Sequence, residues 1–170
     1  MIRLPALPVS LALVFAAPTF ATLAAQSPFG DLQAKPEAKP AAVSYLFPEQ
    51  VTVAADKPAS VDLHFKVADG LHVNSNKPHD EYLIPTTLKL PDTPGIRLAK
   101  IDFPAGADFA FPGSPNEKLS VYTGEFVVHA QFVAAKGDHL VQATLHYQAC
   151  NNSTCMPPHN IPVAIDVIAK

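Results

Sequence analysis

Two cysteines separated by four polar residues are the part of this sequence best suited to chemistry. Cys150 and Cys155 are the only cysteines in the chain, and Asn151-Asn152-Ser153-Thr154 lies between them. Asn and Ser favour turns, and Pro157-Pro158 follows, so the two sulfurs can meet across a short loop. Such a pair can be a structural disulfide, part of a metal site, or a pair that exchanges disulfides with other proteins.

A purely structural disulfide at this spacing would add little stability. Closing a loop of about six residues removes unfolded-state entropy worth about 2 kcal/mol, whereas a bridge between distant strands would stabilise more. The structural interpretation is therefore possible but weak in magnitude.

Thiol–disulfide exchange needs a sulfur that an incoming thiolate can reach and a thiol that can leave as thiolate. A small, exposed ring is more easily reduced than a bridge buried between strands. The polar residues between Cys150 and Cys155 keep the loop exposed, and Pro157-Pro158 stiffens the backbone after the second cysteine. These features permit exchange, but the spacing alone does not select it.

A metal site is the third possibility. Cys150, Cys155, Met156 and His159 form a set of soft ligands that suits Cu(I) better than zinc. A structural zinc site would use four protein ligands, usually with closer cysteines. In an oxidising compartment a disulfide competes with the metal, so copper handling stays an alternative. Neither a structural disulfide nor thiol–disulfide exchange through the two cysteines needs a cofactor.

The N-terminal segment predicts export. Residues 1–25 combine Arg3, a short apolar run and a small-residue end, which is the pattern of a secretory signal peptide cleaved near Ala24 or Ala25. The apolar run is too short to cross a bilayer, so we expect no stable membrane insertion. Residues 26–42 are rich in Pro, Ala and Lys without periodicity, and we predict a flexible tether there. Outside the cytosol, Cys150 and Cys155 are expected to be bonded at rest.

The rest of the chain predicts an all-β domain. The sequence has 18 prolines, 7 glycines and a net charge of −3, which gives no electrostatic footprint for nucleic acid. No window has a helical period. Alternating or apolar runs predict strands near residues 43–47, 61–67, 71–75, 86–90, 96–103, 126–133, 141–149 and 161–167. Residues 74–85 and 104–118 are predicted to be irregular. We predict one domain over residues 43–170, a β-sandwich of about seven to nine short strands.

Three blocks of the sequence resemble one known family. They are Asp69-Gly70-Leu71-His72-Val73, Lys118-Leu119-Ser120-Val121-Tyr122, and Leu145-His146-Tyr147-Gln148-Ala149-Cys150 with Cys155-Met156-Pro157-Pro158. The family is the N-terminal periplasmic domain of the bacterial thiol:disulfide interchange protein DsbD. The resemblance implies a periplasmic, immunoglobulin-like sandwich in which the cysteine pair cycles between disulfide and dithiol. It implies an electron carrier or protein-disulfide reductase. A DsbD-type membrane protein would feed it through a thioredoxin-like domain, and exported thioredoxin-like or isomerase partners would receive the electrons.

The resemblance also implies roles for single residues. Cys150 and Cys155 would be the exchanging pair, with Cys155 engaging partners first. An aromatic cap shields the disulfide in the family, and residues 108–113 match that region, so Phe109 or Phe111 is the expected cap, with Asp108 beside it. His72, Tyr147 and Pro157 are also expected to line the site.

The chain departs from the family pattern at several points. Of the family's acidic pair in the cap loop only Asp108 lies nearby, and His159 replaces the acidic residue often found after Pro-Pro. Fewer residues separate the cysteines than in the best-known members. Leu71, His72 and Asn74 stand where those members carry aromatic side chains. The alternative to a redox carrier is an immunoglobulin-like binding module that handles copper or uses the disulfide only as a structural link.

Overall fold

Apolar residues at alternate positions make long strands whose inner faces form the core. The structure is a computed structural model that describes residues 41–46, 50–111 and 114–170, without the side chains of residues 111, 114 and 115. Within these residues there are only strands, turns and irregular segments: β1 (Val43–Tyr45), β2 (Gln50–Val53), β3 (Pro58–Val67), β4 (His72–Asn74), β5 (Thr87–Lys89), β6 (Ile96–Asp102), β7 (Ala107–Phe111), β8 (Ser114–Tyr122), β9 (Glu125–Ala134), β10 (Gly137–Tyr147), β11 (Ala149–Cys150) and β12 (His159–Ala169).

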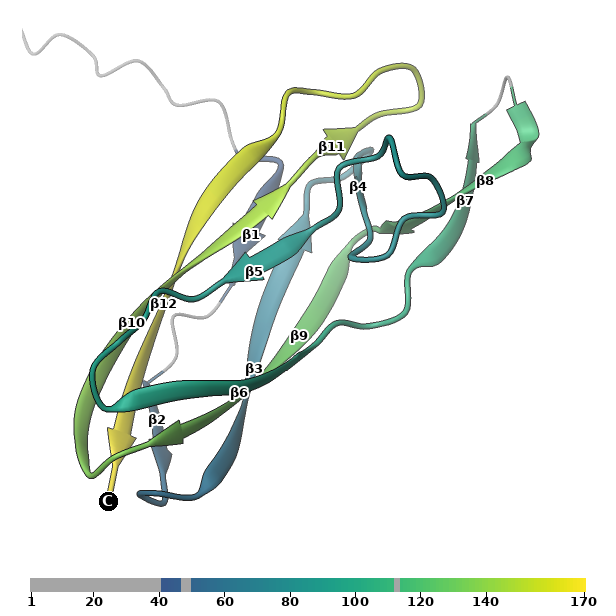
Figure 1. The fold of residues 1–170 in the computed structure, drawn as a ribbon. Coiled ribbons are helices and arrows are strands. Elements are labelled where there is room, and N and C mark those ends of the chain that lie inside the picture. The colour runs from purple at the N-terminus through teal and green to yellow at the C-terminus, as the bar shows by residue number, and fades with distance from the viewer. Residues whose placement is uncertain (1–40, 47–49, 112–113) are drawn as a thin grey trace, which may run out of the picture. The chain divides into compact units, whose positions relative to one another are not determined.

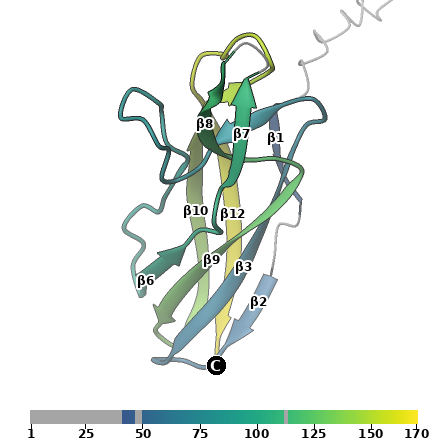
Figure 2. The same cartoon turned by 90° about the vertical axis from the view of Figure 1, so that its right-hand side faces the viewer.

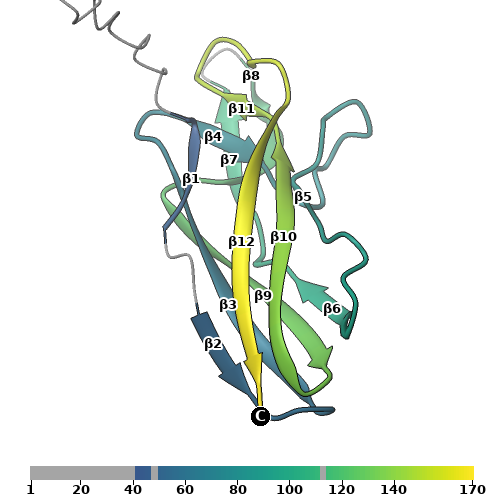
Figure 3. The same ribbon diagram turned by 90° about the vertical axis from the view of Figure 1, so that its left-hand side faces the viewer.

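Two four-stranded sheets form the sandwich. One has the order β1-β3-β9-β6 and faces the viewer in Figure 2. The other has the order β2-β12-β10-β5, and Figure 3 shows its long central strands β10 and β12. All pairings in these sheets are antiparallel except that of β2 with β12. Fully buried side chains such as Leu63, Phe65, Leu145 and Ile165 alternate with more exposed residues and fill the core between the sheets. The prediction of an all-β, immunoglobulin-like sandwich is confirmed.

A third sheet, of order β11-β4-β8-β7, lies at the end of the sandwich away from the C-terminus (Figure 1). Strand β4 follows β3 after a turn in which Gly70 has a φ of 77°, a left-handed conformation that glycine adopts without strain. Strand β11 follows β10 after a single residue, Gln148, and β8 leads into β9. The third sheet is therefore built from extensions of the sandwich strands and is anchored by the same core.

The strand predictions were incomplete in two regions: β2 (Gln50–Val53) lies outside every predicted segment, and residues 104–118 also contain strands. Each of the eight predicted segments contains a strand, but the prediction of an irregular stretch over residues 104–118 is wrong. Most of it pairs as the β7–β8 hairpin, with Ala107 opposite Val121 and Phe109 opposite Leu119. This stretch is rich in Pro and Gly and has weak strand propensity of its own. Its pairing depends on β8, which is held against β4.

The N-terminal predictions concern residues that the structure does not describe. The predicted signal peptide, residues 1–25, and all but the last two residues of the predicted tether lie outside the described residues. Among the residues that the structure covers, no helix is long and apolar enough to cross a membrane.

Candidate functional site

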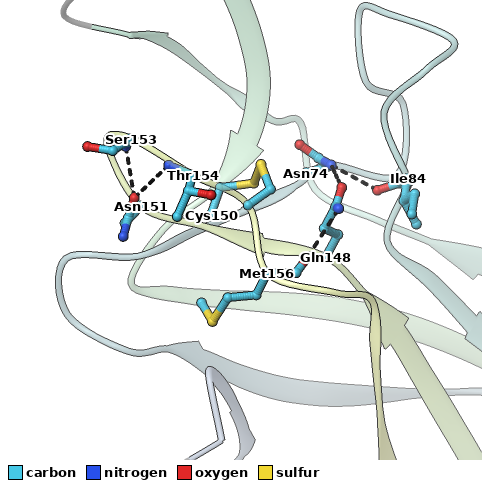
Figure 4. Close-up of a disulfide and its surroundings, with 9 residues drawn as sticks. Asn74, Ile84, Gln148, Cys150, Asn151, Ser153, Thr154 and Met156 are labelled. Atoms are coloured by element: carbon cyan, nitrogen blue, oxygen red, sulfur yellow. Dashed lines mark hydrogen bonds between the residues drawn. A yellow bond between two sulfur atoms is a disulfide. The ribbon is translucent and has the colours of Figure 1, made fainter.

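The two cysteines form a disulfide whose sulfurs have different surroundings. Cys150 is the last residue of β11 and is fully buried, whereas Cys155 is exposed. The two residues also pair through their backbones as an isolated antiparallel bridge. The disulfide therefore closes a short hairpin loop (Figure 4), with a buried residue at one end and an exposed residue at the other.

Hydrogen bonds within this loop set its shape. The Asn151 side-chain oxygen accepts from the backbone N–H groups of Ser153 and Thr154, both at 2.8 Å. The Asn151 N–H donates to the Thr154 carbonyl at 2.9 Å. This Asx-type turn explains why an Asn-rich linker suits the position. The loop is held by its own hydrogen bonds as well as by the S–S bond.

A second set of hydrogen bonds holds the chain on either side of the disulfide. Asn74 Nδ2 donates to the Gln148 side-chain oxygen at 3.3 Å and to the Ile84 carbonyl at 3.0 Å. Gln148 Nε2 donates to the Met156 carbonyl at 3.2 Å, and the Met156 N–H donates to the Ala149 carbonyl at 2.8 Å. Figure 4 shows Gln148 between β4 and the segment after Cys155. Sequence reasoning missed this role. The only signal in the sequence is that Gln148 is a polar residue between the apolar residues Tyr147 and Ala149, shortly before Cys150.

His72 is the cross-strand neighbour of Cys150. In the β4–β11 pairing His72 lies directly opposite Cys150, and Val73 lies opposite Ala149. Directly opposite residues in an antiparallel pair project from the same face. Val73 and Ala149 point into the hydrophobic core, so His72 and Cys150 point to the other face of the third sheet. The register thus brings together a cysteine and a histidine that are far apart in sequence.

Phe109 covers the imidazole. Its ring centroid lies 4.1 Å from that of His72, with the planes tilted by 34°. His72 is only 2% exposed, and desolvation lowers the pKa of its imidazole. Phe109 thus contacts the residue that lies opposite Cys150 in the sheet. The side chain of Phe111, the other expected cap, lies outside the described residues.

Asp108 does not face the disulfide side of the hairpin. Neighbouring strand residues project to opposite faces, so Asp108 points away from the side on which Phe109 meets His72. Its carboxylate forms an exposed ion pair with Lys118 across the hairpin at 3.1 Å. This ion pair links the two strands of the hairpin. The negative charge of Asp108 therefore lies on the face of the hairpin away from His72.

A cavity of about 340 Å³ opens beside the covered histidine. Its wall includes His72 and Phe109, the turn residues Asp69 and Gly70, and Asn152 at the tip of the cysteine loop. The cavity thus lies between the hairpin, the turn before β4 and the cysteine loop. A side chain of an approaching molecule could enter next to the cysteine loop.

The remaining predicted site residues lie in three different environments. Tyr147 is part of the core, and its hydroxyl accepts from the Val43 N–H at 3.3 Å. Pro157 is exposed in the segment that follows Cys155. His159 begins β12 opposite Tyr147, with the two ring centroids 6.3 Å apart.

The possible copper ligands do not gather around the sulfurs. The Met156 side chain packs against the core and extends away from the disulfide in Figure 4. Among the described residues, no group of three or more His, Cys, Asp or Glu side chains is placed to hold a metal ion. No observation on these residues therefore favours the copper alternative.

Comparisons with known proteins agree on the type of domain. A family model described as "Thiol:disulfide interchange protein DsbD, N-terminal" matches residues 42–165. The N-terminal periplasmic domain of ScsB from Proteus mirabilis is 14% identical to this chain, with a TM-score of 0.50. The match covers 68% of this chain and 43% of the ScsB domain, so this chain spans less than half of that structure. The reduced DsbD N-terminal domain from Neisseria meningitidis is 22% identical with a TM-score of 0.45, over 65% of this chain and 79% of that one. The curated proteins include no match.

Gly106, immediately before β7, is predicted to be required for the position of the hairpin. A Cβ at this residue would collide with the Ser120 hydroxyl and would approach Ser75 Cβ to 2.8 Å, where the two serine hydroxyls share a hydrogen bond. We expect Gly106→Ala to lower the free energy of unfolding by about 1–3 kcal/mol, the usual cost of overpacking. Urea unfolding measures it. Ala105→Ser is the control, because it adds one atom at an exposed neighbour. Equal stability of Gly106→Ala and wild type would contradict the prediction.

The lowered pKa of His72 predicts a loss of stability in mild acid. The unfolded chain takes up a proton near the ordinary value of about 6.5, whereas the folded chain does so only at lower pH. The stability that comes from a neutral His72 is therefore present above about pH 6.5 and is lost as the pH falls below it.

We expect His72→Gln to show a smaller drop in the free energy of unfolding between about pH 7 and pH 5 than wild type does. Urea unfolding at several pH values tests this. His146→Gln serves as the control, because His146 hydrogen-bonds to Asn160 on a solvent-exposed part of the sandwich. An unchanged pH dependence in His72→Gln would refute the assignment.

Proposed function

Because this chain belongs to the family of N-terminal domains of the thiol:disulfide interchange protein DsbD, we propose that it relays electrons in the periplasm through Cys150 and Cys155. Family membership and the disulfide together support thiol–disulfide exchange as the general chemistry. The observation that carries the finer proposal is the unequal burial of the two cysteine residues. It gives each cysteine a separate task.

In the reductive half of the cycle, a donor thiolate attacks the exposed sulfur of Cys155. The S–S bond breaks, Cys150 leaves as a thiolate and takes up a proton, and a mixed disulfide joins the donor to Cys155. The second thiol of the donor then attacks the donor sulfur that is bonded to Cys155. The donor forms its own disulfide, and Cys155 is released as a thiolate. The donor has lost two electrons, and Cys150 and Cys155 are both reduced.

In the oxidative half, the Cys155 thiolate attacks a disulfide of a client, and Cys150 then resolves the mixed disulfide. We propose exported thioredoxin-like proteins or isomerases as clients and a DsbD-type membrane protein as donor, because family membership is the support for both. The predicted signal peptide supports the periplasmic location. Phe109, through its contact with His72, is the proposed cap that limits access to the pair.

The reduction potential tests this function directly. We expect the reduction potential of Cys150–Cys155 to lie above about −300 mV, so that a thiol buffer poised near −300 mV reduces the pair, whereas structural disulfides of exported proteins stay oxidised at that potential. Equilibration with dithiothreitol or glutathione mixtures, followed by alkylation of free thiols and mass measurement, gives the potential. A pair that stays oxidised well below that value would be a structural link and would end the proposal.

Single-cysteine variants test the order of the two sulfurs. We expect Cys150→Ser, which keeps the exposed Cys155, to react with dithiobis-nitrobenzoate at least about tenfold faster than Cys155→Ser, because a thiolate must be accessible to act as nucleophile. Release of the coloured thionitrobenzoate measures both rates. Equal rates in the two variants, or a faster reaction of Cys155→Ser, would contradict the assignment of first contact to Cys155.

A further inference from the structure

The burial of Cys150 creates a chemical requirement that Cys155 does not share. To resolve a mixed disulfide, Cys150 must attack as a thiolate, the nucleophilic form of cysteine. An ordinary thiol is mostly protonated at neutral pH, and removal from water disfavours its charged form further. Cys150 is fully buried, so water has poor access to its proton. A nearby group that accepts this proton would remove the obstacle.

His72 is placed to be that group. It is the residue directly opposite Cys150 in the β4–β11 pair and projects from the same face. The Cβ atoms of such a pair lie about 4.5–5.5 Å apart, so an imidazole can reach the neighbouring sulfur. The Phe109 ring, 4.1 Å away, restrains the imidazole and keeps it covered. Cross-strand register and the hairpin together hold a base beside the buried thiol.

We propose that His72 accepts the proton of Cys150 when this cysteine resolves the mixed disulfide, an inference that rests on the exchange function proposed above. Histidine is the residue most often used for such proton transfer. Cysteine–histidine pairs are a common way to activate a thiol. Neutral imidazole is the form that can accept a proton, and the lowered pKa of His72 keeps it neutral at physiological pH.

The resolving step moves one proton and exchanges one S–S bond for another. Cys155 is bonded to a client sulfur, and Cys150 carries its proton. As the Cys150 sulfur attacks Cys155 Sγ, its S–H proton passes to the imidazole of His72. The Cys150–Cys155 bond forms, the bond between Cys155 and the client breaks, and the client sulfur leaves as a thiolate. The two cysteines lose two electrons over the whole half-cycle and the client disulfide gains them. His72 then passes its proton to solvent or to the departing thiolate.

The other groups around His72 are poorly suited to this task. Besides Phe109, the cavity wall includes Thr123 and Gly124 from the turn between β8 and β9, Asn152 from the cysteine loop and Asp69 from the turn before β4. Asp69 is the single other titratable group among the described residues of this wall, and it is exposed to solvent. Asp108 and Lys118 pair with each other on the other face of the hairpin.

Two-phase kinetics isolate the resolving step. The reduced protein is mixed with dithiobis-nitrobenzoate. Attack by Cys155 releases one thionitrobenzoate at a rate that rises with reagent concentration. Attack by Cys150 on the resulting mixed disulfide releases the second at a rate independent of that concentration. Both phases are followed by absorbance across a range of pH in wild type, His72→Gln, His72→Phe and His129→Gln. His129 is the control because it is bound to Asp62 on an exposed face of the sandwich.

We expect the second phase to be about 100-fold slower at pH 7 in both His72 variants, the usual scale for loss of a general base, while the first phase is unchanged. The deficit should shrink as the pH rises, because hydroxide then removes the thiol proton without help. His129→Gln should match wild type in both phases.

Two results would overturn the role of His72 and leave the exchange function intact. One is a wild-type second phase at neutral pH in either His72 variant. The other is a deficit of the same size at every pH, which would show that His72 only supports the local structure. A wild-type protein that releases no second thionitrobenzoate would instead refute the exchange function itself.

Discussion

The strand register at the end of the sandwich decides where the reactive sulfur lies. In β4 and β11, Val73 and Ala149 are buried in the core, so their neighbours His72 and Cys150 must project to the opposite face. A shift of one residue would exchange the two faces. It would bury the imidazole and the disulfide in the core and expose apolar side chains. The hydrophobic core therefore specifies the position of the chemistry, although no core side chain takes part in it.

A face that points away from the core would normally be open to water. Here the β7–β8 hairpin, which extends the same sheet, brings Phe109 against His72. In the cysteine loop, Cys150 is buried and Cys155 is exposed. Two chemically identical residues acquire different access to solvent from backbone arrangement alone. The proposed two-step exchange, in which one sulfur meets the partner and the other completes the transfer, uses this asymmetry.

The sequence predicts the sandwich well and the surroundings of the disulfide less completely. The strand that contains Leu63 and Phe65 shows strict alternation, which depends only on which face is buried, and β3 follows it. The β7–β8 hairpin has no comparable signal, because its pairing comes from contact between β8 and β4. The Gln148 bridge to Met156 also leaves only a weak signal in the sequence, since it joins segments on the two sides of a loop. Local pattern predicts the strands, and long-range pairing supplies the neighbours of the cysteines.

The cysteine segment also keeps its position by means other than the S–S bond. Asn151 closes the loop by accepting hydrogen bonds from Ser153 and Thr154, and Gln148 ties the chain beyond Cys155 to β4 through Asn74. The disulfide itself closes a ring of about six residues, so its reduction removes only about 2 kcal/mol of chain-entropy stabilisation. The buried core and the β10–β12 pairing do not depend on this bond. Reduction can therefore open one bond at the tip of the domain while the strands that position both sulfurs stay in place, which is what the proposed exchange cycle requires.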